Sequence, residues 1–141
     1  MSNQLQELWI EARVKALEGW VEYLLNTLRT VEVMVEPRPA LVMMEARDSV
    51  EKERFCVGEL LVTECQLLYH DKGFWGRVLG NQPLRAFGLA LLEAAQDCVP
   101  EALDSLEGSF RKESAFIQRQ RAQMGKALGA TKVQFDTMTP T

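Results

Sequence analysis

The sequence predicts one α+β domain: N-terminal helices, an antiparallel sheet of four to five strands, two C-terminal helices and a final short strand. Before residue 30 and after residue 83, apolar residues recur at spacings of three and four, which is typical of helices. Between those regions they alternate with polar residues or form short runs, which is typical of strands. A chain of 141 residues can bury one sizeable core, so we expect residues 1–141 to form a single domain.

The N-terminal stretch, residues 5–28, has the spacing of an amphipathic helix. Gly19 lies within it and costs about 1 kcal/mol relative to alanine in a helix interior. We therefore expect either one helix bent at Gly19 or two helices that meet there. Trp9 and Trp20 are expected to pack in the core.

Four strands are expected between residues 31 and 80. Pro37 and Pro39 interrupt the first alternating stretch, so one strand should end near Glu36 and a second should start near Leu41. The third covers residues 55–68, and the polar turn YHDKG leads into the fourth, GFWGRVLG. Short links between consecutive strands favour an antiparallel meander.

The remaining elements are two helices and a strand. Pro83 suits the first turn of a helix that is apolar almost all round, so this helix should be buried against the sheet and end before Pro100. Residues 101–129 then repeat apolar positions on one face, with charged residues on the other. Residues 132–136 alternate again and predict a short strand at the edge of the sheet or of a partner's sheet.

Composition restricts the classes of partner that the protein could bind and the cellular compartment in which it is expected. The net charge of -4 does not favour binding to nucleic acid. No apolar run is long enough to span a membrane and the N-terminus lacks a signal-peptide layout, so we expect a cytoplasmic protein without membrane contact. Three cysteines without a CxxC pair favour ordinary thiols over disulfides, and no metal site is expected.

Candidates for chemistry are few. His70 is the only histidine and lies in a predicted turn. Glu59 and Glu64 fall on opposite faces of their strand unless the chain bulges near Gly58, so a carboxylate pair is not favoured. Glu64 and His70 remain the catalytic candidates, and a small stand-alone hydrolase built on them with Cys65 is one alternative function.

A second candidate site is the turn before the helix that begins near Pro83. The segment LGNQPLR places a glycine turn at a helix N-terminus, where free backbone N–H groups attract anions, and Arg85 follows. Arg85 is therefore the candidate for substrate binding. The chain has no GxxxxGK[ST] or GxGxxG motif, so it lacks a recognised triphosphate cradle of its own.

Three motifs, read together, resemble a known family. They are a Phe-x-x-Gly-Glu opening into LVTEC, a glycine turn before an alanine-rich helix, and the ending ATKVQFDTM. Their order and spacing, from about Arg54 to Met138, are similar to those of the PhnG family, which provides one component of the carbon-phosphorus lyase core complex.

The resemblance implies a component of a bacterial cytoplasmic system that breaks down phosphonates. With subunits H, I and L, such a protein serves the transfer of the ribose 5-triphosphate of ATP to methylphosphonate, with release of adenine. The chain would bind no cofactor alone, because ATP is a substrate of the complex, and it would be inactive by itself. Its implied partners are subunits I, H, J and L, and a homodimer inside the complex is a further alternative.

Two departures from the family's motifs bear on these expectations. Relatives often have Gly-Arg-Asp where this chain has Gly80, Asn81 and Gln82, which removes two charges from the candidate anion site. Near the C-terminus, Asp136 replaces a second aromatic residue, and a partner contact made there would be reduced.

Assembly is the role that these observations favour. Apolar residues without an evident place in a monomer core are expected to contribute to the interface with the I subunit or with a second copy. They are Phe74, Trp75, Phe135 and Met138. A remaining alternative is an adaptor of an unrelated pathway that binds a partner along a sheet edge.

Overall fold

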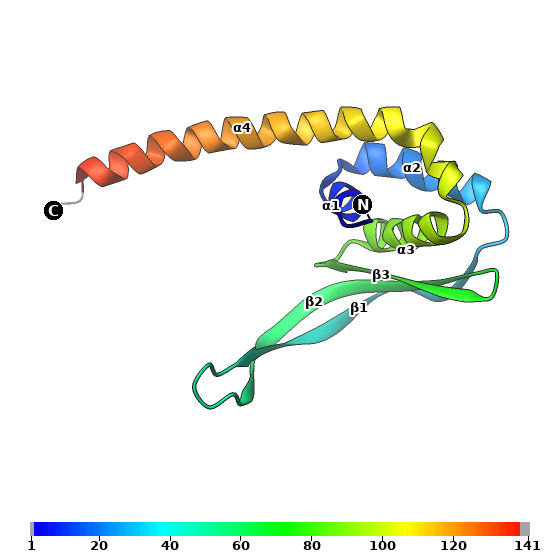
Figure 1. Cartoon of the computed structure of the whole chain (residues 1–141), viewed down its shortest axis with the longest axis horizontal. Coiled ribbons are helices and arrows are strands. Elements are labelled where there is room, and N and C mark those ends of the chain that lie inside the picture. Colours follow the sequence, from blue (N-terminus) through cyan, green and yellow to red (C-terminus); the bar gives the residue numbers. More distant parts are fainter. Residues whose placement is uncertain (1, 139–141) are drawn as a thin grey trace.

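The computed structural model describes residues 2–138, with side chains described from residue 4 to residue 128. An antiparallel sheet with strand order β1-β2-β3 carries α3 on one face, with α1 and α2 beyond it and α4 running across the top (Figure 1). The chain is thus α+β, as predicted. In chain order the elements are α1 (Ser2–Glu11), α2 (Val14–Thr27), β1 (Glu32–Arg47), β2 (Arg54–Tyr69), β3 (Lys72–Leu79), α3 (Pro83–Cys98), the 3-10 helix η1 (Pro100–Leu106) and α4 (Glu107–Met138).

The break between α1 and α2 lies at residues 12 and 13, so the prediction of a break at Gly19 was wrong. Arg13 has an extended backbone, with φ of -64° and ψ of 148°, whereas Gly19 lies inside α2 in open space. Two distant side chains fix the break: Arg85 binds the carbonyl of Ala12, and Glu113 accepts the N–H of Arg13. Tertiary contacts therefore outweigh the local cost of glycine.

A single strand, β1, replaces the predicted hairpin around Pro37 and Pro39, and that prediction was wrong. Proline has no backbone N–H to donate, which would break the hydrogen bonding of a central strand. Because β1 is an outer strand, it tolerates both prolines. The register also shifts between Val35 and Arg38, which takes Pro37 out of the pairing. The described residues therefore form a three-stranded sheet rather than one of four to five strands.

The hairpin of β2 and β3 matches its prediction closely. The register runs without a break from Tyr69 and Lys72 to Val62 and Leu79. His70 and Asp71 at its turn both have positive φ, 49° and 63°, as a type I′ turn requires.

Helix α3 lies very close to β3, as its apolar sequence predicted. A Cβ added at Gly76 would overlap the carbonyl oxygen of Ala86 and lie 2.8 Å from the backbone nitrogen of Ala90, so only glycine permits this approach. Above α3, the rings of Trp9, Trp20 and Phe110 pack with centroids 4.8 to 6.1 Å apart. Both tryptophans are core residues, as expected.

Helix α4 continues through residue 138, so the predicted final strand over residues 132–136 was wrong. Extending an existing helix avoids the free-energy cost of nucleation. Five residues of apolar and polar alternation are too few to favour a strand over this extension. The other predicted C-terminal helix is present as α3.

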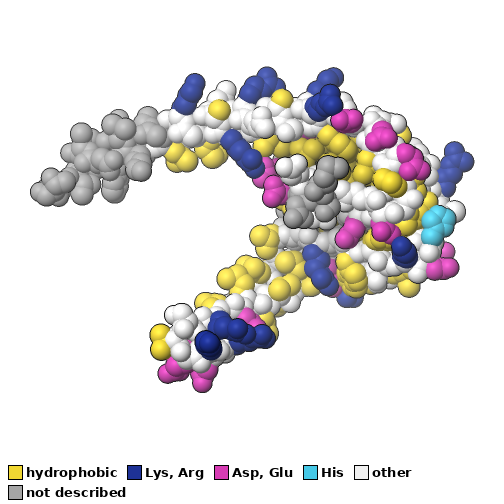
Figure 2. All heavy atoms as spheres, viewed as in Figure 1, with side chains coloured by type: hydrophobic (Ala, Val, Ile, Leu, Met, Phe, Trp, Pro, Cys, Tyr) yellow, Lys and Arg dark blue, Asp and Glu magenta, His cyan; other side chains and the backbone are white. Residues whose placement is uncertain are grey.

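One part of the sheet extends beyond the rest. Strand β3 ends where Leu79 pairs with Val62, but β1 and β2 continue together. Residues 41–61 thus form a two-stranded projection, called the β arm below. The space-filling view shows a hollow between this arm and the part of α4 that extends past α1 (Figure 2).

Candidate functional site

Glu64 ties the three strands together on the sheet face opposite α3. Its direct neighbours in the register are Arg38 on β1 and Arg77 on β3. Arg38 Nη2 lies 3.0 Å from Glu64 Oε1, and Arg77 Nε lies 3.3 Å from Oε2. The carboxylate is largely buried between two half-exposed guanidinium groups, and Arg77 also stacks 4.9 Å from the ring centre of Trp75.

This arrangement keeps Glu64 ionised. The hydrogen bond from Arg38, together with that from Arg77, lowers the pKa of the Glu64 carboxyl despite its partial burial. A carboxylate with a lowered pKa and two cationic partners is a poor proton donor or acceptor near neutral pH. The geometry suits a cross-strand tie better than acid-base catalysis.

Glu59 and Glu64 point to opposite faces, as the alternation predicted. The register shift near Gly58 falls between Gly58 and Cys56, which is outside the segment that joins the two glutamates. The pairing from Glu59 to Glu64 is continuous, so their parity is kept.

The other candidate for catalysis, His70, is distant from Glu64. It lies exposed in the β2–β3 turn, with its ring centre 4.1 Å from that of Tyr69. Six strand residues correspond to about 20 Å, so the fold does not bring the two candidates together. Cys65 belongs to the opposite, buried face, where burial raises the pKa of its thiol to about 11.

Arg85, the candidate for substrate binding, is buried inside the chain's own hydrogen-bond network. Its Nη1 donates to the carbonyls of Trp9 and Ala12, both at 2.8 Å, and its Nε donates to Gln82 Oε1. The guanidinium thus satisfies carbonyls at the end of α1. The side chain of Gln82 holds the Arg85 guanidinium in place. The spacing of three residues between Gln82 and Arg85 was the available sequence signal.

A further pair that the sequence did not reveal joins α4 to the start of α2. The carboxylate of Glu113 accepts a hydrogen bond from the backbone N–H of Arg13 at 2.9 Å. It also forms an ion pair with the Arg13 guanidinium at 2.6 Å. The hydrogen bond from Arg13 lowers the pKa of Glu113, which is only 3% exposed. Arg13 also stacks on Phe116, 3.7 Å from the ring centre.

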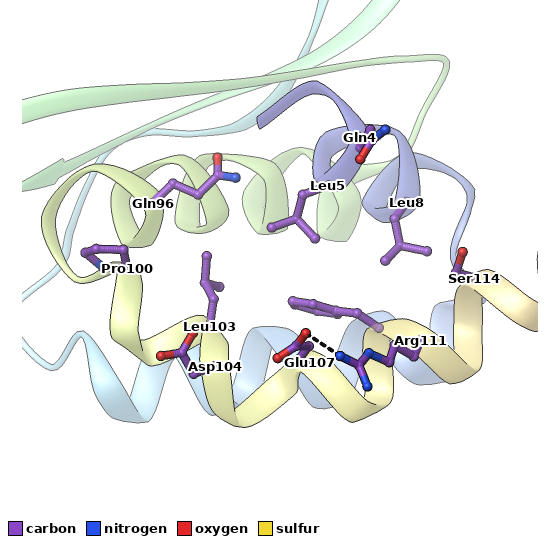
Figure 3. Close-up of a pocket in the computed structure, with 11 residues that line it drawn as sticks. Gln4, Leu5, Leu8, Gln96, Pro100, Leu103, Asp104, Glu107, Arg111 and Ser114 are labelled. Atoms are coloured by element: carbon purple, nitrogen blue, oxygen red, sulfur yellow. Dashed lines mark hydrogen bonds and ion pairs between the residues drawn. The ribbon is translucent and has the colours of Figure 1, made fainter. Parts of the chain in front are cut away.

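A groove of about 710 Å³ opens between α1, η1 and α4 (Figure 3). Leu5, Leu8 and Leu103 point into it, and polar side chains surround them. Two of these polar residues, Glu107 and Arg111, form an ion pair with each other at 2.8 Å. The groove is therefore apolar inside and offers no cluster of groups suited to catalysis.

The four residues expected at an interface divide into three cases. Phe74 is only 8% exposed and packs in the core, so the expectation that it has no place there was wrong. Trp75 is 38% exposed on the outer face of the sheet. The side chains of Phe135 and Met138 lie outside those that the structure describes.

Metal and membrane sites find no support in the described residues. Among the side chains that the structure describes, from residue 4 to residue 128, no three of His, Cys, Asp or Glu gather as metal ligands. No helix in that range is long and apolar enough to cross a membrane.

Comparison with known proteins gives one match that covers nearly the whole chain. The family model described as "Phosphonate metabolism protein PhnG" matches residues 3–140. No curated protein matches the chain.

Proposed function

The chain belongs to the PhnG family of phosphonate metabolism proteins, and from this premise we propose that it is a non-autonomous subunit of the carbon-phosphorus lyase system. In this proposal it works with subunits H, I and L in the cytoplasm. Together they transfer the ribose 5-triphosphate of ATP to methylphosphonate and release adenine. The chain binds no cofactor of its own, and ATP is a substrate of the complex.

The proposed reaction is a displacement at the anomeric carbon of the ribose. A phosphonate oxygen forms the new bond to this carbon while the bond to adenine N9 breaks, and adenine leaves with the electron pair and gains a proton. Such a reaction needs a group that protonates the base and cations that hold the triphosphate.

The described side chains of this chain are poorly suited to those tasks. Glu64 is held as a carboxylate by Arg38 and Arg77, His70 lies in an exposed turn, and Arg85 is buried against α1. This separation of the candidate residues is the observation that supports the proposal. The reactive groups then belong to subunits H, I and L, and this chain contributes to assembly with the partner subunits I, H, J and L.

Reconstitution tests the proposal. Subunits H, I and L are combined with ATP and methylphosphonate, with and without this chain, and adenine release is measured. We expect release only when the chain is present, and none from the chain alone. Adenine release by the chain alone at the rate of the full mixture would contradict the proposal, as would an unchanged rate when the chain is omitted.

A further inference from the structure

A continuous groove runs between α1 and α4, two helices that lie far apart in the sequence. The groove of about 710 Å³ described above joins a second hollow of about 330 Å³, because Gln4, Leu8 and Ser114 line both. The two together are called the α1–α4 groove below. Along α4 it extends from Glu107 to Arg121, a stretch of helix that is about 21 Å long. A separate helix of about four turns has the same length.

Each wall of the α1–α4 groove is one face of a helix. The lining positions recur at spacings of three and four, both on α4 within residues 107–121 and on α1 within residues 4–11. Leu5, Leu8 and Leu103 are only partly buried and point into the groove (Figure 3). Two rows of side chains with this spacing can take the side chains of a third helix between them.

A helical segment suits these walls better than an extended one. The backbone groups inside α1 and α4 are hydrogen-bonded within each helix, so the walls offer side chains and no free backbone edge. A docked helix satisfies its own backbone N–H and C=O groups, whereas a docked strand would leave many of them unpaired. Recognition of this type depends on apolar side chains three and four positions apart in the bound helix.

The rim of the α1–α4 groove is acidic. Its charged side chains are four carboxylates and two guanidinium groups, and both arginines form ion pairs with glutamates of the same rim. The other two carboxylates, Glu7 and Asp104, have no ion-pair partner among the side chains from residue 4 to residue 128. Asp104 lies at the η1 end of the groove, and Glu7 lies at the end near Arg121. Each end therefore carries one uncompensated negative charge.

We propose that the α1–α4 groove binds an amphipathic helical segment of another protein, one with an apolar face and basic residues at both ends. The apolar face contacts Leu5, Leu8 and Leu103, and the basic residues pair with Asp104 at one end and with Glu7 at the other. This charge complementarity selects a basic segment over an acidic one. One docked helix covers less surface than a permanent subunit interface, so the contact is reversible. The inference does not rest on the proposed reaction.

Fluorescence anisotropy of a labelled synthetic peptide tests the proposal on the purified full chain. The probe, called the lysine peptide, has about sixteen residues, with leucine at every third or fourth position and lysines at both ends. We expect it to bind the chain. Two matched peptides should bind about tenfold more weakly or worse: one has glutamate in place of each lysine, and the other has a central proline that prevents a continuous helix.

Variants of the groove show whether the peptide binds there. Leu8→Glu places a charge among the apolar side chains and should weaken binding of the lysine peptide about tenfold or more. Asp104→Lys, at an exposed position of η1, should weaken it about threefold or more and should strengthen binding of the glutamate peptide, which a loss of folding could not do. Glu51→Lys makes the same charge change at the tip of the β arm and is the matched control, which should leave binding unchanged. Far-UV circular dichroism confirms that each variant is folded.

Photo-cross-linking places the peptide directly. A diazirine group at the centre of the lysine peptide is activated by light, and mass spectrometry identifies the modified residues, which we expect within 4–11 and 103–121. Adducts only on the β arm or on the outer face of the sheet would overturn the proposal. So would a failure of the lysine peptide to bind, equal binding of all three peptides, or binding that neither groove variant changes. A chain that is dimeric in sedimentation equilibrium and monomeric as Leu8→Glu would also overturn it, because the groove then holds a second copy.

Discussion

Arg13 and Glu113, which are 100 residues apart in the sequence, meet where α4 crosses the start of α2. The Glu113 carboxylate accepts the first free N–H of α2 and also holds the guanidinium of the same residue. It therefore acts as an N-cap supplied by another helix, at a helix start where no local side chain caps. This one side chain joins the N-terminal helices to the long C-terminal helix.

Removal of that cap should destabilise the fold. We expect Glu113→Ala to lower the free energy of unfolding by about 1 to 2 kcal/mol, because a buried acceptor is lost but its partner Arg13 is half-exposed. Urea denaturation measures the change. Glu107→Gln, which removes an exposed ion pair with Arg111, is the control and should change stability by about 0.5 kcal/mol or less. Equal effects of the two variants would show that Glu113 is no cap.

The same carboxyl should make stability depend on pH. The pKa of Glu113 is lowered from its ordinary value of 4.5 by the hydrogen bond from Arg13, so the unfolded chain binds a proton at higher pH than the folded one. Its contribution is therefore complete above pH 4.5 and is lost as the pH falls through the folded value. Denaturation at neutral and acid pH should show a smaller acid-dependent loss in Glu113→Gln than in the unchanged chain. An identical loss in both would contradict this assignment.

Substitution by alanine at two glycines should change the stability of the fold in opposite directions. Gly76→Ala places a methyl group against the carbonyl of Ala86, which must move α3 away from the sheet, so we expect a loss of about 3 kcal/mol or more. Gly19→Ala fills open space inside α2 and should stabilise by about 1 kcal/mol. Thermal melts of the two variants compare them. A Gly76→Ala variant as stable as the unchanged chain would rule out the close approach of α3 to β3.

Variants of the catalytic candidates should leave the reaction intact. In the reconstituted mixture, we expect Glu64→Gln and His70→Ala each to keep adenine release within about twofold of normal, since neither group faces a shared site. Recovery of the assembled complex by gel filtration is measured alongside. A loss of a hundredfold or more with full assembly would assign a catalytic role to that residue.

The cysteines should differ sharply in reactivity. Cys56 is exposed on the arm, whereas Cys65 is fully buried and burial raises the pKa of its thiol to about 11. A thiol reagent at pH 8 should label Cys56 rapidly and Cys65 only after denaturant is added. Mass spectrometry of the labelled peptides distinguishes them. Rapid labelling of Cys65 in the folded chain would contradict its place in the core.

The sequence predicted those elements whose signals are local and long. The apolar run of β2, the turn at His70 and the nearly all-apolar helix after Pro83 are all present. Errors arose where distant contacts decide the outcome. Pro37 and Pro39 are tolerated because β1 lies at the edge of the sheet, and strand order is not encoded in the local pattern.

The candidate site was harder to predict than the fold, because its residues take partners from remote parts of the chain. Arg85 donates hydrogen bonds to carbonyls more than seventy residues away in the sequence, and no spacing rule predicts that pairing. Parity correctly separated Glu59 from Glu64, yet it could not show that two arginines from neighbouring strands would surround Glu64. Burial and ion pairing within the chain thus decide which polar side chains are free to bind a substrate or to take part in catalysis.

The projecting arm also bears on how long a solitary copy survives in the cell. Its tip, residues 48–53, is an exposed turn of the kind that proteases cut, and the apolar ribbon behind it favours aggregation while it is uncovered. Copies made in excess of their binding partners are then removed first. The abundance of this protein would follow the supply of whatever covers its arm, so balanced synthesis would be enforced by degradation.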